Sequence, residues 1–390
     1  MVRIGDICII NPKAQTFDED YLVSFVPMPK VGENGEFDAS DIKEYREVKK
    51  GFTYFQNGDV LFAKITPCME NGKGAIARNL KNGIGFGSTE FHVLRPIPDV
   101  VLGEWLYYLL SWTDFRKEAE KNMTGSAGQK RVPKSFLENY QVVVPSLDIQ
   151  EKQVNIFKNL DLLISLRKQQ LSKLDELVKS RFVELFGDPV KNDMGWKTTS
   201  LKNATSKIGS GATPKGGKES YQAEGITLIR SMNVHDGRFE YKDLAHITDE
   251  QAKQLDNVAI EENDVFINIT GASVARSCIV PKHILPARVN QHVAIIRCIT
   301  SMLNPVFANN MFLNHSFKEQ LLDIGETGGA TRQAITKQQL ESLEVILPPL
   351  ELQNQFADFV EQIDKSKFEI QKSLEKLETL KKALMQKYFG

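Results

Sequence analysis

The stretch 124–187 begins Thr124-Gly-Ser-Ala-Gly-Gln-Lys-Arg131, continues through Pro145-Ser-Leu-Asp-Ile-Gln150 and ends Leu185-Phe-Gly187. The chain contains it twice, because these landmarks return as Thr327-Gly-Gly-Ala-Thr-Arg-Gln333, Pro348-Pro-Leu-Glu-Leu-Gln353 and Tyr388-Phe-Gly390. The offset is 203 residues from Gly125 to Gly328 and again from Gly187 to Gly390, so the copies align without a gap. A repeat of this length decides the architecture before any single element is assigned.

Each copy predicts a polar glycine-rich loop, a short strand and one long helix. The strands are expected at 141–144 and 345–347, where a proline ends an apolar run. The helices are expected from about 148 to 186 and from about 351 to 389, and neither contains an internal proline or glycine. A helix of about 40 residues is roughly 60 Å long, and such a helix with a polar outer face usually packs in a coiled coil.

Apolar residues recur at three- and four-residue intervals along both predicted helices, as one face of a paired helix requires. These stripe residues are Phe157, Leu160, Ile164, Leu171, Leu174, Val178 and Leu185 in the first helix and Val360, Ile363, Ile370, Leu374, Leu377 and Leu384 in the second. Basic residues interrupt the stripe, namely Arg167, Arg181, Lys367 and Lys381. Neither helix is therefore expected to be stable alone. We predict that the two pair as an antiparallel coiled coil with a pseudo-twofold axis, and the alternative is two amphipathic helices in one larger bundle.

The remaining sequence predicts an α+β fold with two globular regions. In the first region, strand-like runs at 7–10, 23–26, 59–63 and 91–94 alternate with turns, and a helix is expected at 101–120. The predicted organisation is a first globular domain at 1–146, a long helix at 147–187, a linker and second globular domain at 188–347, and a second long helix at 348–390.

The second globular region echoes the first only weakly. Gly58-Asp-Val-Leu61 matches Asn263-Asp-Val-Phe266, Ile65-Thr66 matches Ile269-Thr270, and His92-Val93 matches His292-Val293. The long helices are thus near-copies, whereas the globular regions share a scaffold and differ in their loops. This contrast indicates that the two globular regions share one scaffold and recognise different targets.

Composition limits the classes of function. The chain has 390 residues, which suggests two to three domains, and a formal net charge of −1, which does not by itself indicate a nucleic-acid binder. Its four cysteines are far apart in sequence and form no CxxC pair, so reduced buried thiols and a cytosolic setting are expected. The first residues, Met1-Val-Arg-Ile-Gly-Asp6, do not have the pattern of a signal peptide, and no apolar run approaches membrane-spanning length, so we expect no membrane partner.

No catalytic or metal motif is complete. The run Ala212-Thr-Pro-Lys-Gly-Gly-Lys-Glu219 lacks the first glycine and the Ser/Thr of a phosphate-binding loop. The series Gly83-x-Gly85-x-Gly87 is too short for a dinucleotide fingerprint and is expected to be a turn between strands. Pro348-Pro349 lacks the aromatic residue that an adenine methyltransferase needs next. The histidines show no metal-ligand spacing, and His92 and His292 are expected to be structural, so we predict no metal site.

Polar and basic side chains suited to base edges and phosphates are concentrated in the loops. The candidates of the first region are Lys64, Thr66, Asn71, Lys73, Ser126, Gln129, Lys130 and Arg131. Those of the second are Ser210, Thr213, Lys215, Arg230, Asn233, Thr270, Arg276, Arg288, Asn290, Gln291, Thr331, Arg332 and Gln333. Any one of them could be an ordinary solvated loop residue. The loops 124–131 and 327–333 are the strongest candidates, because their glycines let the backbone approach a phosphate closely.

Together these features resemble the DNA-specificity subunits of type I restriction–modification systems. The residues that carry the resemblance are the paired Pro145-Ser-Leu-Asp-Ile-Gln150 and Pro348-Pro-Leu-Glu-Leu-Gln353, the linker Leu185-Phe-Gly-Asp-Pro189 with Gly195-Trp196, and Ser210-Gly-Ala-Thr-Pro214. Each motif is short, but the ordered set repeated at 203 residues is specific and covers essentially the whole chain. The first region has Ile10-Asn-Pro-Lys13 near the place where the second has its Ser-Gly-Ala-Thr-Pro.

The resemblance implies that each globular domain recognises one half of a split site in double-stranded DNA and that the long helices set the spacing. It also implies two methyltransferase subunits and motor-nuclease subunits as partners. The chain itself would then be non-catalytic and need no cofactor, with S-adenosylmethionine, ATP and Mg²⁺ bound only by the partners. A second class of function is a non-catalytic coiled-coil adaptor with two ligand-binding lobes, and the salt dependence of DNA binding distinguishes the two.

Overall fold

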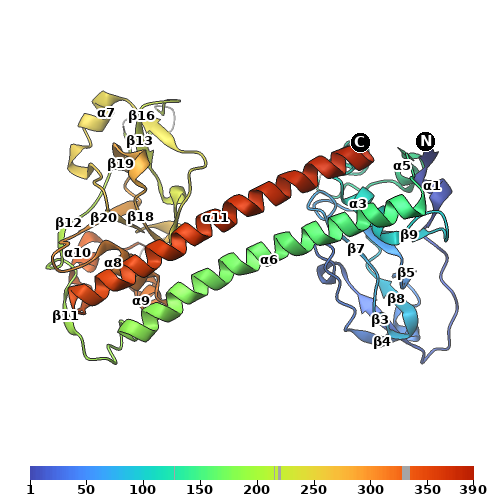
Figure 1. Cartoon of the computed structure of the whole chain (residues 1–390), viewed down its shortest axis with the longest axis horizontal. Helices are drawn as coiled ribbons and strands as arrows, with labels where there is room; N and C mark the ends of the chain where they lie inside the picture. Colours follow the sequence, from blue (N-terminus) through green and yellow to red (C-terminus); the bar gives the residue numbers. More distant parts are fainter. Residues whose placement is uncertain (127, 215, 218–220, 327–333) are drawn as a thin grey trace. The chain divides into compact units, whose positions relative to one another are not determined.

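The computed structural model describes residues 1–126, 128–214, 216–217, 221–326 and 334–390 (Figure 1). Its contacts divide the chain into two units. The first comprises Met1–Lys168 together with Lys372–Gly390, and the second comprises Gln169–Gln371. Each unit therefore contains one globular region and part of both long helices.

Two four-stranded sheets form the body of the first unit. One is antiparallel, with the order β2 (Cys8–Ile10), β9 (Phe91–Pro96), β6 (Val60–Ala63), β7 (Gly74–Ile76). The other has the order β4 (Ile42–Glu44), β3 (Leu22–Val26), β8 (Ile84–Gly87), β5 (Thr53–Gln56), and in it β3 and β8 are parallel. The unit also contains β1 (Val2–Arg3), β10 (Gln141–Val142), α1 (Ile4–Ile7), α2 (Tyr45–Val48), α3 (Gly103–Ser111), α4 (Thr113–Lys121) and α5 (Lys134–Asn139).

The second unit repeats this plan. Its antiparallel sheet has the order β12 (Thr205–Ser210), β20 (Val293–Cys298), β17 (Val265–Asn268), β18 (Ser277–Ile279), and a second sheet has the order β16 (Ala245–Ile247), β13 (Ile226–Ile229), β19 (Ala287–Val289), with β13 and β19 parallel. The unit also contains β11 (Lys197–Ser200), β14 (Val234–His235), β15 (Arg238–Phe239), β21 (Glu344–Leu347), α7 (Asp249–Lys253), α8 (Pro305–Leu313), α9 (His315–Glu326) and α10 (Lys337–Ser342). The weak sequence echo between the globular regions thus extends to strand order.

Three local predictions were wrong. The helix expected at 101–120 is two helices, because Trp112 adopts an extended conformation with ψ 131° and its side chain is buried. Residues 84–87 form strand β8 and not a turn: a Cβ at Gly85 would lie 2.2 Å from the Phe55 ring, so glycine makes room for this aromatic side chain. The strand expected at 7–10 begins only at Cys8, after the helical turn α1.

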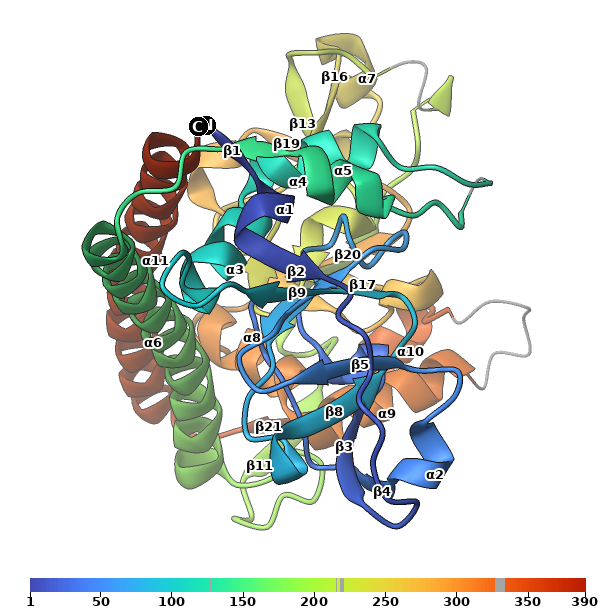
Figure 2. The same ribbon diagram turned by 90° about the vertical axis from the view of Figure 1, so that its right-hand side faces the viewer.

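The long helices are α6 (Leu147–Phe186) and α11 (Leu350–Phe389), each of 40 residues. In the first unit Asp161 of α6 forms an ion pair with Lys381 of α11 at 2.5 Å, and in the second unit Asp175 pairs with Lys367 at 2.5 Å. Within the first unit Lys168 also pairs with Glu378 at 3.3 Å, so later residues of α6 meet earlier residues of α11 there. Both helices are drawn in Figures 1 and 2. The predicted stripe residues are all buried or half-buried. Two of the basic interruptions thus have carboxylate partners on the facing helix.

Each long helix is fastened to a globular region by a buried glutamine near its first turn, which we call the glutamine clamp. Gln150 is fully buried. Its Oε1 accepts from the Leu102 N–H at 2.9 Å, and its Nε2 donates to the carbonyl oxygens of Val100 and Pro145 at 3.0 and 2.8 Å. Gln353 makes the same three bonds, at 2.9, 3.2 and 2.8 Å, to backbone groups of Asn304, Met302 and Pro348. A fully satisfied buried amide fixes the direction in which each helix leaves its region.

The C-terminal end of α11 packs into the globular core of the first unit, and the C-terminal end of α6 packs into that of the second. Phe389 at the end of α11 contacts Trp105 of α3, with ring centroids 5.3 Å apart. Phe186 at the end of α6 contacts Phe307 of α8 at 4.7 Å. Aromatic pairs at these separations contribute beyond the apolar area they bury. Both ends of both helices are therefore held by globular structure.

Candidate nucleic-acid interface

In the first unit, the predicted loops that follow β6 and α4 lie side by side. The Thr66 N–H donates to the Lys130 carbonyl oxygen at 3.0 Å, and Thr124 and Arg131 exchange two backbone hydrogen bonds at 2.9 and 2.8 Å. These bonds close the second loop into a hairpin, as its glycines allow. Residues that are distant in sequence thereby form one polar surface.

Some candidates of this surface are free to contact a ligand and others are not. Asn71, Ser126, Gln129 and Lys130 are exposed. The Arg131 guanidinium forms two hydrogen bonds with the Glu90 carboxylate, at 2.9 and 2.8 Å, and these bonds lower the pKa of Glu90. Arg131 therefore shapes the hairpin instead of offering free donors.

The three other candidates of the first unit are less available. The Thr66 hydroxyl donates to Glu70 Oε1 at 2.6 Å, and Lys73 Nζ donates to the Met28 carbonyl oxygen at 3.4 Å. Lys64 is half-buried. The exposed donors of this surface are consequently Asn71 and the hairpin residues Ser126, Gln129 and Lys130.

In the second unit, candidates from three separate segments come together. The Thr213 hydroxyl donates to Gln291 Oε1, Gln291 Nε2 lies 3.1 Å from His292 Nε2, and His292 Nδ1 lies 2.5 Å from Thr270 Oγ1. Thr213 and Gln291 are exposed, as is Ser210 at the end of β12. Sequence reasoning assigned His292 a purely structural role, and its position next to Gln291 was the available signal for more.

Two predicted contacts are structural residues. Asn233 is fully buried; its Nδ2 donates to the carbonyl oxygens of Glu240 and Lys242 at 3.0 and 3.2 Å, and its Oδ1 accepts from the Arg230 N–H at 3.1 Å. Asn290 is 5% exposed, and its Oδ1 accepts from the backbone N–H two residues later at 3.0 Å. Asparagine often closes turns in this way, so these amides are unavailable to DNA.

The arginines of the second unit differ in availability. Arg288 is engaged: its Nη2 donates to Asp256 Oδ1 at 2.6 Å and its Nε to the Ala252 carbonyl oxygen at 3.1 Å, and its side chain is only 13% exposed. Arg230 donates to the carbonyl oxygen of Asp243 and lies over the Tyr221 ring. Arg276 is half-buried. Because Asp256 and Ala252 lie more than 30 residues from Arg288 in sequence, the pattern alone could not reveal these partners.

Four candidates, Lys215, Thr331, Arg332 and Gln333, lie outside the described residues. The loop 327–333 is followed by Ala334, which forms a β-bridge with Thr270.

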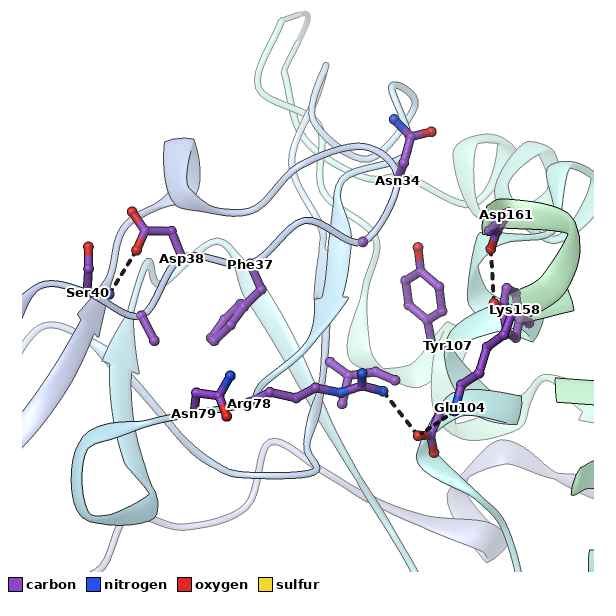
Figure 3. Close-up of a pocket in the computed structure, with 14 residues that line it drawn as sticks. Asn34, Phe37, Asp38, Ser40, Arg78, Asn79, Glu104, Tyr107, Lys158 and Asp161 are labelled. Carbon is purple, nitrogen blue, oxygen red and sulfur yellow. Dashed lines mark hydrogen bonds and ion pairs between the residues drawn. The ribbon is translucent and has the colours of Figure 1, made fainter. Parts of the chain in front are cut away.

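A cavity of about 650 Å³ opens in the first unit between the 34–40 loop, α3 and α6 (Figure 3). Glu104 in its wall accepts from both Arg78 and Lys158, at 3.1 and 3.2 Å. Asp161 accepts from the Tyr108 hydroxyl at 2.9 Å, besides its ion pair with α11. Glu104 and Asp161 in the wall of this cavity are therefore both engaged by neighbouring side chains.

Three of the four cysteines and His92 are buried. Burial raises the pKa of the Cys8, Cys278 and Cys298 thiols to about 12, which keeps them protonated. Burial also lowers the pKa of His92. Within the described ranges, no three His, Cys, Asp or Glu side chains gather as metal ligands. Across the same ranges, no helix is long and apolar enough to cross a bilayer.

Residues 1–176 and 194–382 match the family model described as type I restriction modification DNA specificity domain. The specificity subunit of the type I restriction enzyme EcoAI from Escherichia coli is 28% identical, over 90% of this chain and 74% of that protein. The EcoEI specificity subunit, also from Escherichia coli, is 42% identical over 45% of this chain and 30% of that protein.

The fold also has a solved counterpart. A chain from a structural study of complex assembly and conformational transition in the type I R-M system aligns with a TM-score of 0.59 at 18% identity, over 99% of this chain and 96% of that one. Each stretch that matches the family model contains one globular region and most of the long helix after it. Because the two stretches together span most of its length, this chain belongs to the type I restriction–modification DNA specificity family.

Proposed function

We propose that this chain is the specificity subunit of a type I restriction–modification complex and that each globular region recognises one half of a bipartite DNA site. The observation that carries the proposal is the double match to the DNA specificity domain. The domains would be 1–146 and 188–347, and the chain itself would be non-catalytic.

The long helices, at 147–187 and 348–390, would be the spacer between the domains, paired as an antiparallel coiled coil about a pseudo-twofold axis. The opposite order of the α6 and α11 contacts in the first unit, where Asp161 pairs with Lys381 and Lys168 with Glu378, supports this pairing. So does the burial of the stripe residues. The glutamine clamps support it further, because a spacer sets a distance only if its ends are held.

Two methyltransferase subunits would dock on this scaffold and motor-nuclease subunits would complete the complex in the cytoplasm. S-adenosylmethionine, ATP and Mg²⁺ would belong to those partners. A net charge of −1 gives the isolated chain little nonspecific attraction to DNA. We therefore expect weak DNA binding by the chain alone and tight binding with its methyltransferase partner.

Gel-shift titrations of duplex DNA, with and without the methyltransferase partner and at several salt concentrations, test the proposal. Phosphate contacts make the logarithm of the binding constant fall linearly with the logarithm of salt concentration. The expected result is sequence-selective, salt-dependent binding by the complex. An adaptor protein would show neither selectivity nor a steep salt slope, and equal affinity with and without the partner would contradict the expected dependence on assembly.

A further inference from the structure

Thr213, Gln291, His292 and Thr270 form a continuous chain of hydrogen bonds at the surface of the second unit, which we call the Gln291 network. An amide nitrogen can only donate, so His292 Nε2 accepts from Gln291 Nε2 and the ring proton is on Nδ1, facing Thr270. The Thr213 hydroxyl donates to the amide oxygen of Gln291. The oxygen and the nitrogen of the Gln291 amide therefore have different hydrogen-bond partners, Thr213 and His292.

A close backbone approach brings Thr213 to Gln291. A Cβ on Gly211 would lie 1.6 Å from the Val289 carbonyl oxygen, and the Gly211 N–H donates to the Asn290 carbonyl oxygen at 3.1 Å. Only glycine permits this contact. The motif Ser210-Gly-Ala-Thr-Pro214 thus has a physical role, because its glycine lets the loop lie against the end of β19 and its threonine orients the amide.

The network leaves part of the Gln291 amide unused. A primary amide has two N–H donors and two acceptor positions, and the network uses one of each. One donor and one acceptor remain on an exposed side chain. Glutamine reads adenine in the major groove with this combination, since adenine presents the N7 acceptor beside the N6 amino donor. Guanine presents two acceptors there and would leave the amide oxygen facing another acceptor.

In the first unit, the residues that match Gln291 and His292 are both buried. His92, which matches His292, is buried; it hydrogen-bonds Asn11 Nδ2 at 3.1 Å and the Val132 carbonyl oxygen at 2.8 Å. The residue before it is Phe91, which is 1% exposed. The histidine supports a hydrophobic core in one copy and an exposed amide in the other, so the amide is specific to the second unit.

We infer that Gln291 reads one adenine of the half-site recognised by the second globular region, and that Thr213 and His292 are positioning residues which hold its amide for that contact. The inference rests on the proposed function, because it names a specificity determinant within it. Holding the amide in place before DNA arrives reduces the side-chain entropy that binding would otherwise cost.

The test uses the chain assembled with its methyltransferase subunits. Selection from randomised duplexes defines the bipartite site for the wild type and for Gln291→Ala. At one adenine of one half-site, discrimination against guanine should fall about 5- to 150-fold in the variant, the range of a bidentate base contact. His292→Phe and Thr213→Val should weaken discrimination at that same position by a smaller factor. Gln254→Ala, at an exposed glutamine outside the network, is the matched control.

A nucleotide analogue separates a base contact from a general effect on folding. Replacing that adenine with 7-deazaadenine removes the N7 acceptor. The wild type should lose about 2- to 10-fold in affinity, as for one neutral hydrogen bond, and Gln291→Ala should lose nothing further. Equal losses in both proteins, or unchanged discrimination in Gln291→Ala, would overturn the inference while the selected site itself stands. A wild-type complex that selects no sequence at all would instead refute the proposed function.

Discussion

Lengthening both long helices by one heptad is expected to widen the gap between the two half-sites. The insertions follow Gln170 in α6 and Gln371 in α11, between the Asp161–Lys381 pair of the first unit and the Asp175–Lys367 pair of the second. Duplicating residues 164–170 and 365–371 continues the apolar stripe. Seven residues at 1.5 Å each add about 10 Å. That length corresponds to about three base pairs at 3.4 Å per pair.

The assay is methylation of a DNA library in which the two half-sites are separated by spacers of every length. The heptad variant, assembled with its methyltransferase subunits, should methylate the same half-sites at a gap about three base pairs longer. A four-residue insertion in each helix is the matched control. It turns the stripe by about 40° beyond a whole turn, because each residue advances a helix by about 100°, so it should impair assembly more than the longer insertion. A folded heptad variant that keeps the original gap would refute the spacer role of the helices.

Three predictions concern stability. Gln150→Leu leaves an N–H and two carbonyl groups of the clamp unpaired, so the free energy of unfolding in denaturant titrations should fall by about 2–4 kcal/mol, whereas Gln355→Leu at an exposed position should change it little. Asp264→Ala removes the fully buried carboxylate that holds Arg297 at 2.8 Å, and should cost about 3–5 kcal/mol; a loss below about 1 kcal/mol would show that the pair is dispensable. Arg131→Ala should remove a pH-dependent contribution, because the folded-state pKa of Glu90 is lowered. Such a group stabilises the fold above its unfolded pKa of about 4.3 and loses this effect as pH falls through the folded value. The stability difference from wild type should therefore be constant above about pH 5 and shrink in acid, and a pH-independent difference would contradict the assignment.

The long helices could be predicted from sequence because their signal is local. The stripe that includes Phe157 and Leu374 repeats at helical spacing, and the boundaries at Phe186 and Phe389 are marked by the repeat itself. What the stripe could not show was why Lys381 interrupts it. Its partner Asp161 lies 220 residues earlier, so only the folded pairing explains the charge.

The candidate interface was less predictable, because residue type does not reveal whether a side chain is already engaged. Asn233, Arg288 and Gln291 carry equally suitable groups for DNA, yet the first is enclosed by backbone, the second is tied to Asp256 and the third is exposed. Distinguishing them requires the tertiary neighbours. The break at Trp112 was missed for a similar reason, since burial of its side chain outweighed the local tendency to continue the helix.

The glutamine clamps have a mechanical consequence. A proline-bounded junction between a strand and a helix is a natural place for a hinge, and Gln150 and Gln353 stiffen that joint in both copies with three hydrogen bonds each. Tilting a helix against its domain would break bonds to buried backbone groups. Any adjustment to the local twist of DNA must therefore come from bending of the helices themselves. The long helices would then be the elastic part of the molecule, while their junctions with the globular regions stay rigid.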